Sequence, residues 1–275
     1  IYDISDPPNE TLLHVIPTVG RAFDVKIKDN YAFIASDNGV LTVNVSDPTK
    51  PALVNVFEAG RTGRVLLDES RNILFTDSSW SGLFILDISD PINPVQLSRY
   101  SVYTGPIGSS GSLLYVIDHL NHELQVVNIS DFTNPQEISH CSIEGGVWRG
   151  VIRDNYAFIT SCNNGITIVN ISDPYNISVV SRVLEEQHGC LPEPVFYGKY
   201  MFVSGNGRLI VVDISNITDP EVVFESNQLY VGPLFIYGKY LIAGSKNSIK
   251  VFNISNPENP ELIGTFNVAH GNIVN

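Results

Sequence analysis

The chain carries little charge, and especially little positive charge. Charged residues make up 16% of its 275 residues, against roughly 25% in an average soluble domain. Only 16 residues are basic and 29 are acidic, which gives a net charge of −13 and a pI of about 4.7. Nucleic acids and anionic membrane surfaces require clustered Lys and Arg, so neither is an expected partner. Hydrophobic residues, at 43%, are sufficient for a large core.

Long apolar runs are also absent. No stretch approaches the roughly 20 residues needed to span a bilayer, so we expect no direct membrane insertion. The chain starts at Ile1, without an initiator Met or a signal peptide. We therefore expect a monomeric domain within a larger polypeptide, with any targeting or anchoring segment outside this fragment.

The familiar catalytic motifs are missing as well. The sequence has no Gly-x-Ser-x-Gly elbow, no His-Glu-x-x-His and no Gly-rich phosphate loop. The six histidines are scattered, and the one close pair, His119 and His122, does not complete a metal site by itself. We expect no metal and no cofactor.

What the sequence does contain is a repeat. A short β-rich run ends seven times in the same Asp/Asn-Ile/Val-Ser-Asp/Asn turn, and successive turn serines are 40 to 43 residues apart. A period of this size indicates a solenoid, a propeller or a helical array. The copies are 1–7, 41–48, 83–91, 124–131, 166–174, 209–216 and 249–257.

One unit, residues 21–60, shows which of these architectures applies. The β-rich runs 21–27, 31–35, 41–45 and 52–57 are separated by turn residues. No segment has apolar residues at the i, i+3, i+4, i+7 spacing over the length a helix requires. The unit is therefore predicted to be a four-stranded antiparallel meander. Stacking such meanders radially buries their apolar faces, as in a β-propeller.

The repeats predict an all-β fold in a single domain, residues 1–275. Seven third strands and seven fourth strands can be counted, but only six second strands. We therefore predict seven blades. One of them is a composite closing blade from residues 1–19 and 269–275, whose second strand is expected to lie outside this fragment. Six blades is the alternative. The complete repeats are expected to start near residues 21, 61, 103, 146, 190 and 230.

With these residues in view, the chain resembles the LVIVD-repeat family. Its pattern is a Leu-x-Ile-Val-Asp strand followed by Ile-Ser-Asp-Pro, and residues 166–174 and 209–215 are close matches. The resemblance covers essentially the whole chain. It implies a propeller scaffold from a bacterial or archaeal cell surface or secretion, and it supplies no catalytic residues.

The Asn or Asp before each Ile-Ser is predicted to be structural. Its side chain can accept hydrogen bonds from the N–H groups of the following turn. Four of these positions also fall in Asn-x-Ser glycosylation sequons, namely Asn44, Asn128, Asn170 and Asn253. Recurrence at one position of the repeat favours the structural interpretation.

A candidate ligand site is predicted at the mouth of the propeller channel. Loops joining the second to the third strand, and the fourth strand to the next repeat, share that face. Arg and aromatic residues around such a mouth are typical of a recognition surface, and Arg61 lies beside them. The alternative is that the charges only line a solvated channel, Arg64 and Arg149 pairing with Asp24 and Glu193. The candidates are Arg21, Asp24, Arg64, Tyr103, Trp148, Arg149, His188, Glu193, Tyr230 and His270.

Two of the three cysteines are expected to form a disulfide. Cys162 lies in a loop between a second and a third strand, and Cys190 lies in the loop leaving the same repeat. A Cys162–Cys190 bond would suit an oxidising compartment. Free thiols are the alternative, and Cys141 could compete for Cys162.

The leading hypothesis is a non-enzymatic, extracytoplasmic propeller that binds a protein, a glycan or a cell-envelope component at the channel mouth. Mixed charges there favour polar or carboxylate-bearing ligands. One alternative is a carbohydrate-active hydrolase or lyase with its site at the same mouth, where Asp24 and Glu193 are the carboxylates to test. The other is a purely structural surface-layer repeat. Fold alone cannot choose among them.

Overall fold

A computed structural model describes residues 1–3, 11–16, 18, 20–78, 81–100, 103–162, 164–185, 189–229, 231–245 and 248–267. The secondary structure of these residues is all β, and no membrane-crossing helix is found among them. The chain divides into two compact units. The first comprises Ile1–Leu120 with Val126–Glu137, and the second comprises Asn121–Gln125 with Ile138–Asn275.

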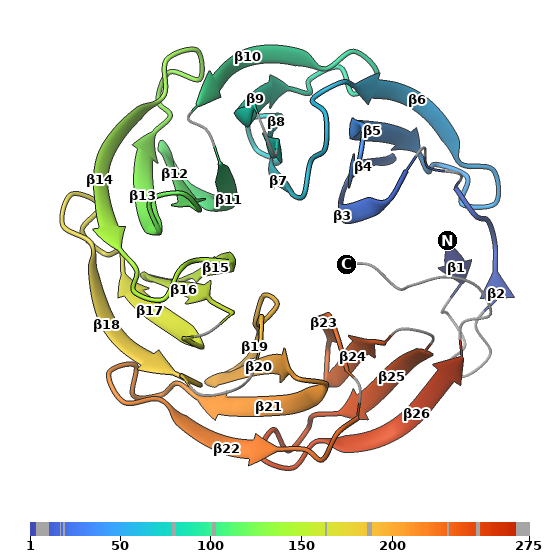
Figure 1. Ribbon diagram of the computed structural model, residues 1–275. Coiled ribbons are helices and arrows are strands. Elements are labelled where there is room, and N and C mark those ends of the chain that lie inside the picture. Colours follow the sequence, from blue (N-terminus) through green and yellow to red (C-terminus); the bar gives the residue numbers. More distant parts are fainter. Residues whose placement is uncertain are drawn as a thin grey trace. The chain divides into compact units, whose positions relative to one another are not determined.

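Six four-stranded sheets, each with its strands in chain order, make up the described structure (Figure 1). This is the fold of a six-bladed β-propeller, and every strand pair with a described register is antiparallel. The first three sheets consist of β3 (Ala22–Lys28), β4 (Tyr31–Ser36), β5 (Gly39–Asn44) and β6 (Ala52–Phe57); β7 (Val65–Asp68), β8 (Ile73–Ser78), β9 (Gly82–Asp87) and β10 (Val95–Tyr100); and β11 (Thr104–Ser110), β12 (Leu113–Asp118), β13 (Glu123–Asn128) and β14 (Gln136–Ser142).

The remaining sheets repeat this order. They consist of β15 (Arg149–Arg153), β16 (Tyr156–Thr160), β17 (Ile166–Asn170) and β18 (Ser178–Val183); β19 (Val195–Tyr197), β20 (Tyr200–Gly205), β21 (Arg208–Asp213) and β22 (Glu221–Glu225); and β23 (Leu234–Tyr237), β24 (Tyr240–Gly244), β25 (Ser248–Asn253) and β26 (Glu261–Asn267).

The prediction of seven blades is wrong, and the six-bladed alternative holds. Among the described residues, the first copy of the repeat forms a two-stranded ladder, in which β1 (Tyr2–Asp3) pairs with β2 (Thr11–Leu12). The prediction counted this copy of the turn motif as part of a four-stranded blade, but a two-stranded ladder is not such a blade. The C-terminal part of the expected composite blade, residues 269–275, lies outside the described residues.

Within each unit, the second and third strands carry the core, because successive sheets pack on one another. In the first sheet nearly all of β4 and β5 is buried, whereas the fourth strand, β6, is mostly exposed. In the first unit Phe33 and Val40 pack with Leu74 and Phe84 of the following sheet. In the second unit Phe202 belongs to the equivalent cluster.

The recurrent Asn or Asp performs the predicted structural task. In all six sheets its Oδ1 accepts the N–H of the serine two residues later, at 2.8–3.1 Å. This hydrogen bond closes the turn between the third and fourth strands. The residues are Asn44, Asp87, Asn128, Asn170, Asp213 and Asn253.

A bulge recurs in the fourth strands. One residue is skipped in the pairing of β6, β10, β18, β22 and β26 with their third strands. Such a bulge re-aims the side chains beside it. Ser98, directly after one bulge, donates to the carbonyl of Phe132 at 2.5 Å, and Ser181 donates to that of Ile217 at 2.6 Å. Within each unit, a fourth strand is thereby bonded to a turn of the next repeat.

Candidate binding site on the loops of the first unit

Two loops of the first unit are held together by a buried threonine. One loop joins β4 to β5, and the other leads from β6 to the next repeat. The Thr62 N–H donates to the carbonyl of Ser36 at 2.9 Å. The Thr62 hydroxyl accepts the N–H of Ser36 at 3.0 Å and donates to the carbonyl of Gly39 at 3.0 Å. Thr62 is fully buried, so the loops have a fixed relative position.

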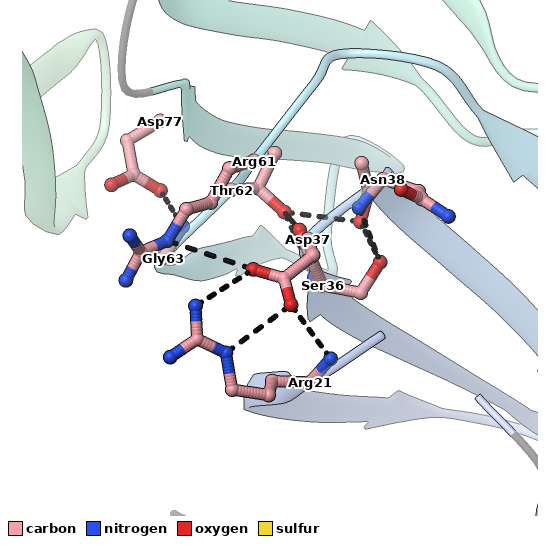
Figure 2. Close-up of polar contacts among 9 residues, drawn as sticks. Arg21, Ser36, Asp37, Asn38, Arg61, Thr62, Gly63 and Asp77 are labelled. Carbon is pink, nitrogen blue, oxygen red and sulfur yellow. Dashed lines mark hydrogen bonds and ion pairs between the residues drawn. The ribbon is translucent and has the colours of Figure 1, made fainter. Parts of the chain in front are cut away.

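Asp37, in the turn between β4 and β5, gathers two arginines (Figure 2). Arg21 donates three times to its carboxylate, from the backbone N–H at 2.9 Å, Nε at 3.2 Å and Nη2 at 3.3 Å. The Nε of Arg61 lies 3.8 Å from Oδ1 of Asp37, the oxygen that also accepts from Nη2 of Arg21. The backbone N–H and then the side chain of Arg21 are the main causes that lower the pKa of Asp37 below its ordinary value. The carboxylate therefore stays ionised.

Phe23 lies beneath both guanidinium groups. The Cζ atoms of Arg21 and Arg61 are 5.3 Å and 4.7 Å from the centre of its ring, which is a favourable cation–π geometry. Phe23 is the residue skipped in the pairing of β3 with β4, between Ala22 and Asp24. We name Arg21, Phe23, Asp37 and Arg61 the arginine cluster.

The arginine cluster has two guanidinium groups and one carboxylate, so one positive charge is not neutralised within it. The side chains of Arg21 and Arg61 are 70% and 53% exposed. Arg61 makes the ion pair with Asp37 and the ring contact with Phe23, and its guanidinium donates no hydrogen bond to any described residue. A guanidinium held in place with its donors open can bind a carboxylate through two parallel hydrogen bonds.

Asp77 is a buried carboxylate next to this cluster. Its Oδ1 accepts the backbone N–H groups of Gly63 and Arg64 at 2.8 Å and 2.7 Å. Burial raises the pKa of Asp77 above its ordinary value, while these two N–H groups and nearby Arg64 oppose the shift. Asp77 thus fixes the backbone that follows Arg61 and Thr62.

We expect Asp77→Asn to preserve the fold and to remove part of its pH dependence. A raised pKa means that the folded protein holds the proton at pH values where the unfolded chain has lost it. Stability therefore falls as pH rises from the ordinary Asp pKa through the raised one. Urea unfolding between pH 3 and pH 7 should show a smaller decline for Asp77→Asn than for the wild type.

Asp77→Ala is the contrasting variant. It leaves the N–H groups of Gly63 and Arg64 without their acceptor, and we expect a loss of about 1–3 kcal/mol in the free energy of unfolding. Equal pH profiles for the wild type and Asp77→Asn would contradict the buried-carboxylate interpretation.

Asp24 has a structural role in the first unit. Its Oδ1 accepts the N–H of Val25 at 2.8 Å, and its Oδ2 accepts the N–H of Val65 at 3.1 Å, in the first strand of the next sheet. The Nζ of Lys26 lies 3.6 Å from Oδ1 of Asp24.

Tyr103 is the counterpart of Arg21 in the third sheet's repeat. The carbonyl of Tyr103 accepts the N–H of His119, just as the carbonyl of Arg21 accepts the N–H of Asp37.

The second unit contains three further candidates. Arg149 and Glu193 form an ion pair of 3.9 Å, the pairing that the solvated-channel alternative predicts for them. The side chain of Trp148 is 47% exposed. The other three candidates, His188, Tyr230 and His270, lie outside the described residues. A binding role for any of these six stays a prediction.

Cys162 and Cys190 form a disulfide, the pair expected from their loops, and Cys141 is free. The bond occupies the place that the Asp37–Arg61 ion pair holds in the first unit. Leu191 donates to the carbonyl of Ser161 at 3.4 Å, just as Thr62 donates to that of Ser36. The cysteines directly follow Ser161 and precede Leu191. One repeat therefore joins these two loops by charge and another joins them covalently.

Sequence reasoning placed Arg21 and Arg61 together but missed Phe23, Asp37 and Asp77. Asp37 falls among the turn residues that separate the predicted strands 31–35 and 41–45. No group of three potential metal ligands occurs within the ranges that the structure describes.

Solved structures with the same fold come from several bacteria. A Lactobacillus plantarum protein matches with a TM-score of 0.76 at 14% identity, over 88% of this chain and 83% of its own. A functionally unknown protein from Desulfotomaculum acetoxidans gives 0.70 at 15%, over 93% and 88%. A putative 6-phosphogluconolactonase from Bacteroides fragilis gives 0.70 at 11%, over 87% and 82%. These likenesses show the fold alone.

Sequence comparison identifies the repeat itself. No curated protein matches the chain. The family model of the LVIVD repeat matches residues 19–58, 77–102, 104–142, 144–185, 195–227 and 230–268. The chain therefore belongs to the LVIVD-repeat family.

Proposed function

We propose that this protein is a non-enzymatic, extracytoplasmic binding module that recognises a carboxylate-bearing protein, glycan or envelope component through the arginine cluster. The observation that carries the proposal is Arg61, which is half exposed, oriented on Phe23 and without a hydrogen-bond acceptor among the described residues. An arginine in this state has already lost much of its conformational freedom, so binding costs less ordering entropy.

The charge of the chain makes this position selective. A net charge of −13 repels acidic partners from most of the surface. The arginine cluster offers a local excess of positive charge, so an acidic group is attracted there. The Cys162–Cys190 disulfide supports an oxidising compartment.

Binding to immobilised acidic polymers tests the proposal. We expect the wild type to bind polygalacturonate or poly-glutamate more tightly than neutral dextran, with an affinity that falls as salt increases. Arg61→Ala should weaken this binding at least about tenfold, because one bidentate pair is lost. The two acidic polymers separate a glycan partner from a polypeptide partner.

Arg208→Ala is the matched control. The Arg208 side chain is 50% exposed, close to the 53% of Arg61, but it pairs with Glu225 at 2.6 Å on a sheet of the second unit. It should leave binding unchanged. Equal binding of acidic and neutral polymers, or equal losses in the two variants, would exclude the arginine cluster as the recognition point.

A further inference from the structure

The fourth strand of each described four-stranded sheet lies at an edge of that sheet. A free edge presents N–H and C=O groups that can pair with a further strand, and proteins commonly prevent such pairing with charged side chains on the edge. In five of the six sheets the fourth strand contains a charged residue. These residues are Arg99, Glu137, Arg182, Glu221, Glu225 and Glu261.

The remaining fourth strand, β6, has no such protection. Its sequence, Ala-Leu-Val-Asn-Val-Phe, contains no charged residue. The apolar residues Leu53, Val54 and Val56 are 48%, 37% and 39% exposed. The first unit therefore presents an uncharged, apolar strand edge, which is the kind of surface that accepts an added strand.

The backbone of β6 is free along its outer edge. β5 pairs with one side of β6, and no described strand pairs with the other side. Apart from that pairing, the described residues give the backbone of β6 one hydrogen bond, from the N–H of Ala59 to the carbonyl of Phe57 at 3.0 Å. A bulge can also protect an edge, but β10, β18, β22 and β26 have both a bulge and a charge. The missing charge is therefore what distinguishes β6 from these strands.

Two charged residues, Lys50 and Glu58, flank β6. Both are exposed, and neither side chain forms an ion pair with a described residue. Lys50 precedes Val54 by the same number of residues as Glu58 follows it. If two β6 strands pair antiparallel with Val54 at the centre, Lys50 of each strand lies opposite Glu58 of the other. The ends of β6 are thus complementary in charge to a second copy of β6.

The charge of the chain also favours approach at β6 over approach elsewhere. Two copies with a net charge of −13 each repel one another over most of their surfaces. Lys50 is the only charged residue in the segment 48–57. Two copies can therefore bring their β6 edges together without bringing acidic side chains into contact within the strands.

We propose that β6 pairs with β6 of a second copy of this chain, in an antiparallel arrangement with a two-fold axis at Val54. The two edge strands then form one backbone ladder, and the same surface serves both copies, as in other two-fold dimers. One strand pair is smaller than the roughly 1,200–2,000 Å² of a stable interface. The dimer is therefore weak and depends on concentration. This inference differs from the monomer expected from the sequence, and it does not depend on the arginine cluster.

Sedimentation velocity from micromolar to millimolar concentration tests the inference, together with hydrogen exchange. We expect the sedimentation coefficient to rise with concentration from that of a monomer toward that of a dimer. Amide exchange in a peptide covering β6 should slow over the same range, because the outer N–H groups become hydrogen-bonded. A monomer at millimolar concentration, or a dimer with unchanged exchange in β6, would overturn the proposal.

Two matched lysine variants locate the contact. Leu53 and Val222 are each the second residue of a fourth strand, and they are 48% and 47% exposed. Leu53→Lys places a charge on the β6 edge and should weaken the dimer at least about tenfold. Val222→Lys makes the same kind of change on β22 and should dimerise as the wild type does. Equal dimerisation of the two variants would show that β6 is not the interface.

Reversing the flanking charges tests the direction and register of the pairing. Lys50→Glu sets a glutamate opposite Glu58 at both ends of the interface, and it should weaken the dimer at least about threefold. The double variant Lys50→Glu/Glu58→Lys restores opposite charges and should recover the wild-type affinity. A double variant as weak as Lys50→Glu would contradict the antiparallel register centred on Val54.

Further measurements separate dimerisation from folding and from the proposed binding function. Both lysine substitutions are at exposed positions, so thermal unfolding of Leu53→Lys and Val222→Lys should match that of the wild type. Arg61→Ala should dimerise normally, and monomeric Leu53→Lys should still bind polygalacturonate or poly-glutamate. Failure of the β6 contact is therefore distinguishable from failure of the arginine cluster.

Discussion

Replacing Phe202 with alanine is expected to lower the free energy of unfolding by about 3–5 kcal/mol. Phe202 lies in β20, is fully buried, and packs in a cluster with Leu241 and Phe252 of the next sheet. Removing its ring creates a cavity between two sheets that are themselves held by backbone ladders and cannot collapse freely. Urea unfolding followed by circular dichroism measures the loss.

Phe235→Ala is the matched control for this prediction. Phe235 lies in β23 and is 60% exposed. The same chemical change should therefore cost less than about 0.5 kcal/mol. Similar losses at the two positions would contradict the assignment of the core to the spaces between successive sheets.

Loss of the Cys162–Cys190 bond is expected to have the second large effect. The two cysteines are 28 residues apart, and a cross-link of that span stabilises a fold by about 3 kcal/mol, chiefly by restricting the unfolded chain. The double variant Cys162→Ser/Cys190→Ser should unfold at correspondingly lower urea concentration. Dithiothreitol should lower the wild type to a similar midpoint and leave the double variant unchanged.

Cys141→Ser controls for the chemistry of the substitution. Cys141 is free and lies in β14, so its replacement should change stability little. Thiol titration of the folded, unreduced protein should detect one thiol, because the other two sulfur atoms are bonded. Detection of three thiols would refute the disulfide.

The strands were predictable from sequence to within one or two residues. The runs 31–35 and 52–57 correspond to Tyr31–Ser36 and Ala52–Phe57. Alternating apolar residues between Asn, Gly and Pro turns specify such strands locally. The repeat then specifies their order, because each sheet can bury its faces only against another.

The number of blades and the bulges could not be predicted in the same way. The turn motif of the first copy is indistinguishable from the others, although the part of this copy that the structure describes is the two-stranded β1–β2 ladder. The bulge in β6 skips Val54, yet the run Ala-Leu-Val-Asn-Val-Phe has no residue that marks it. The number of blades and the bulges both depend on the pairing partners of the strands. The residues of a strand do not specify those partners.

The arginine cluster was half predictable. Arg21 and Arg61 follow glycines at the entrances of successive repeats, so the period places them at equivalent positions. Asp37 could not be assigned to them, since an aspartate that closes a turn and one that binds arginine have the same sequence signature. Phe23 was obscured because its orientation depends on the irregular pairing of β3 with β4.

The equivalence of the Asp37–Arg61 contact and the Cys162–Cys190 bond means that the two loop junctions respond to different solution conditions. Acidification protonates Asp37 only when the pH falls through its depressed pKa, and concentrated electrolyte screens the same contact. Neither treatment breaks the Cys162–Cys190 disulfide. A reductant breaks the disulfide and leaves the Asp37–Arg61 ion pair intact. The Asp37–Arg61 contact can thus be weakened without the Cys162–Cys190 bond, and the bond can be broken without weakening the contact.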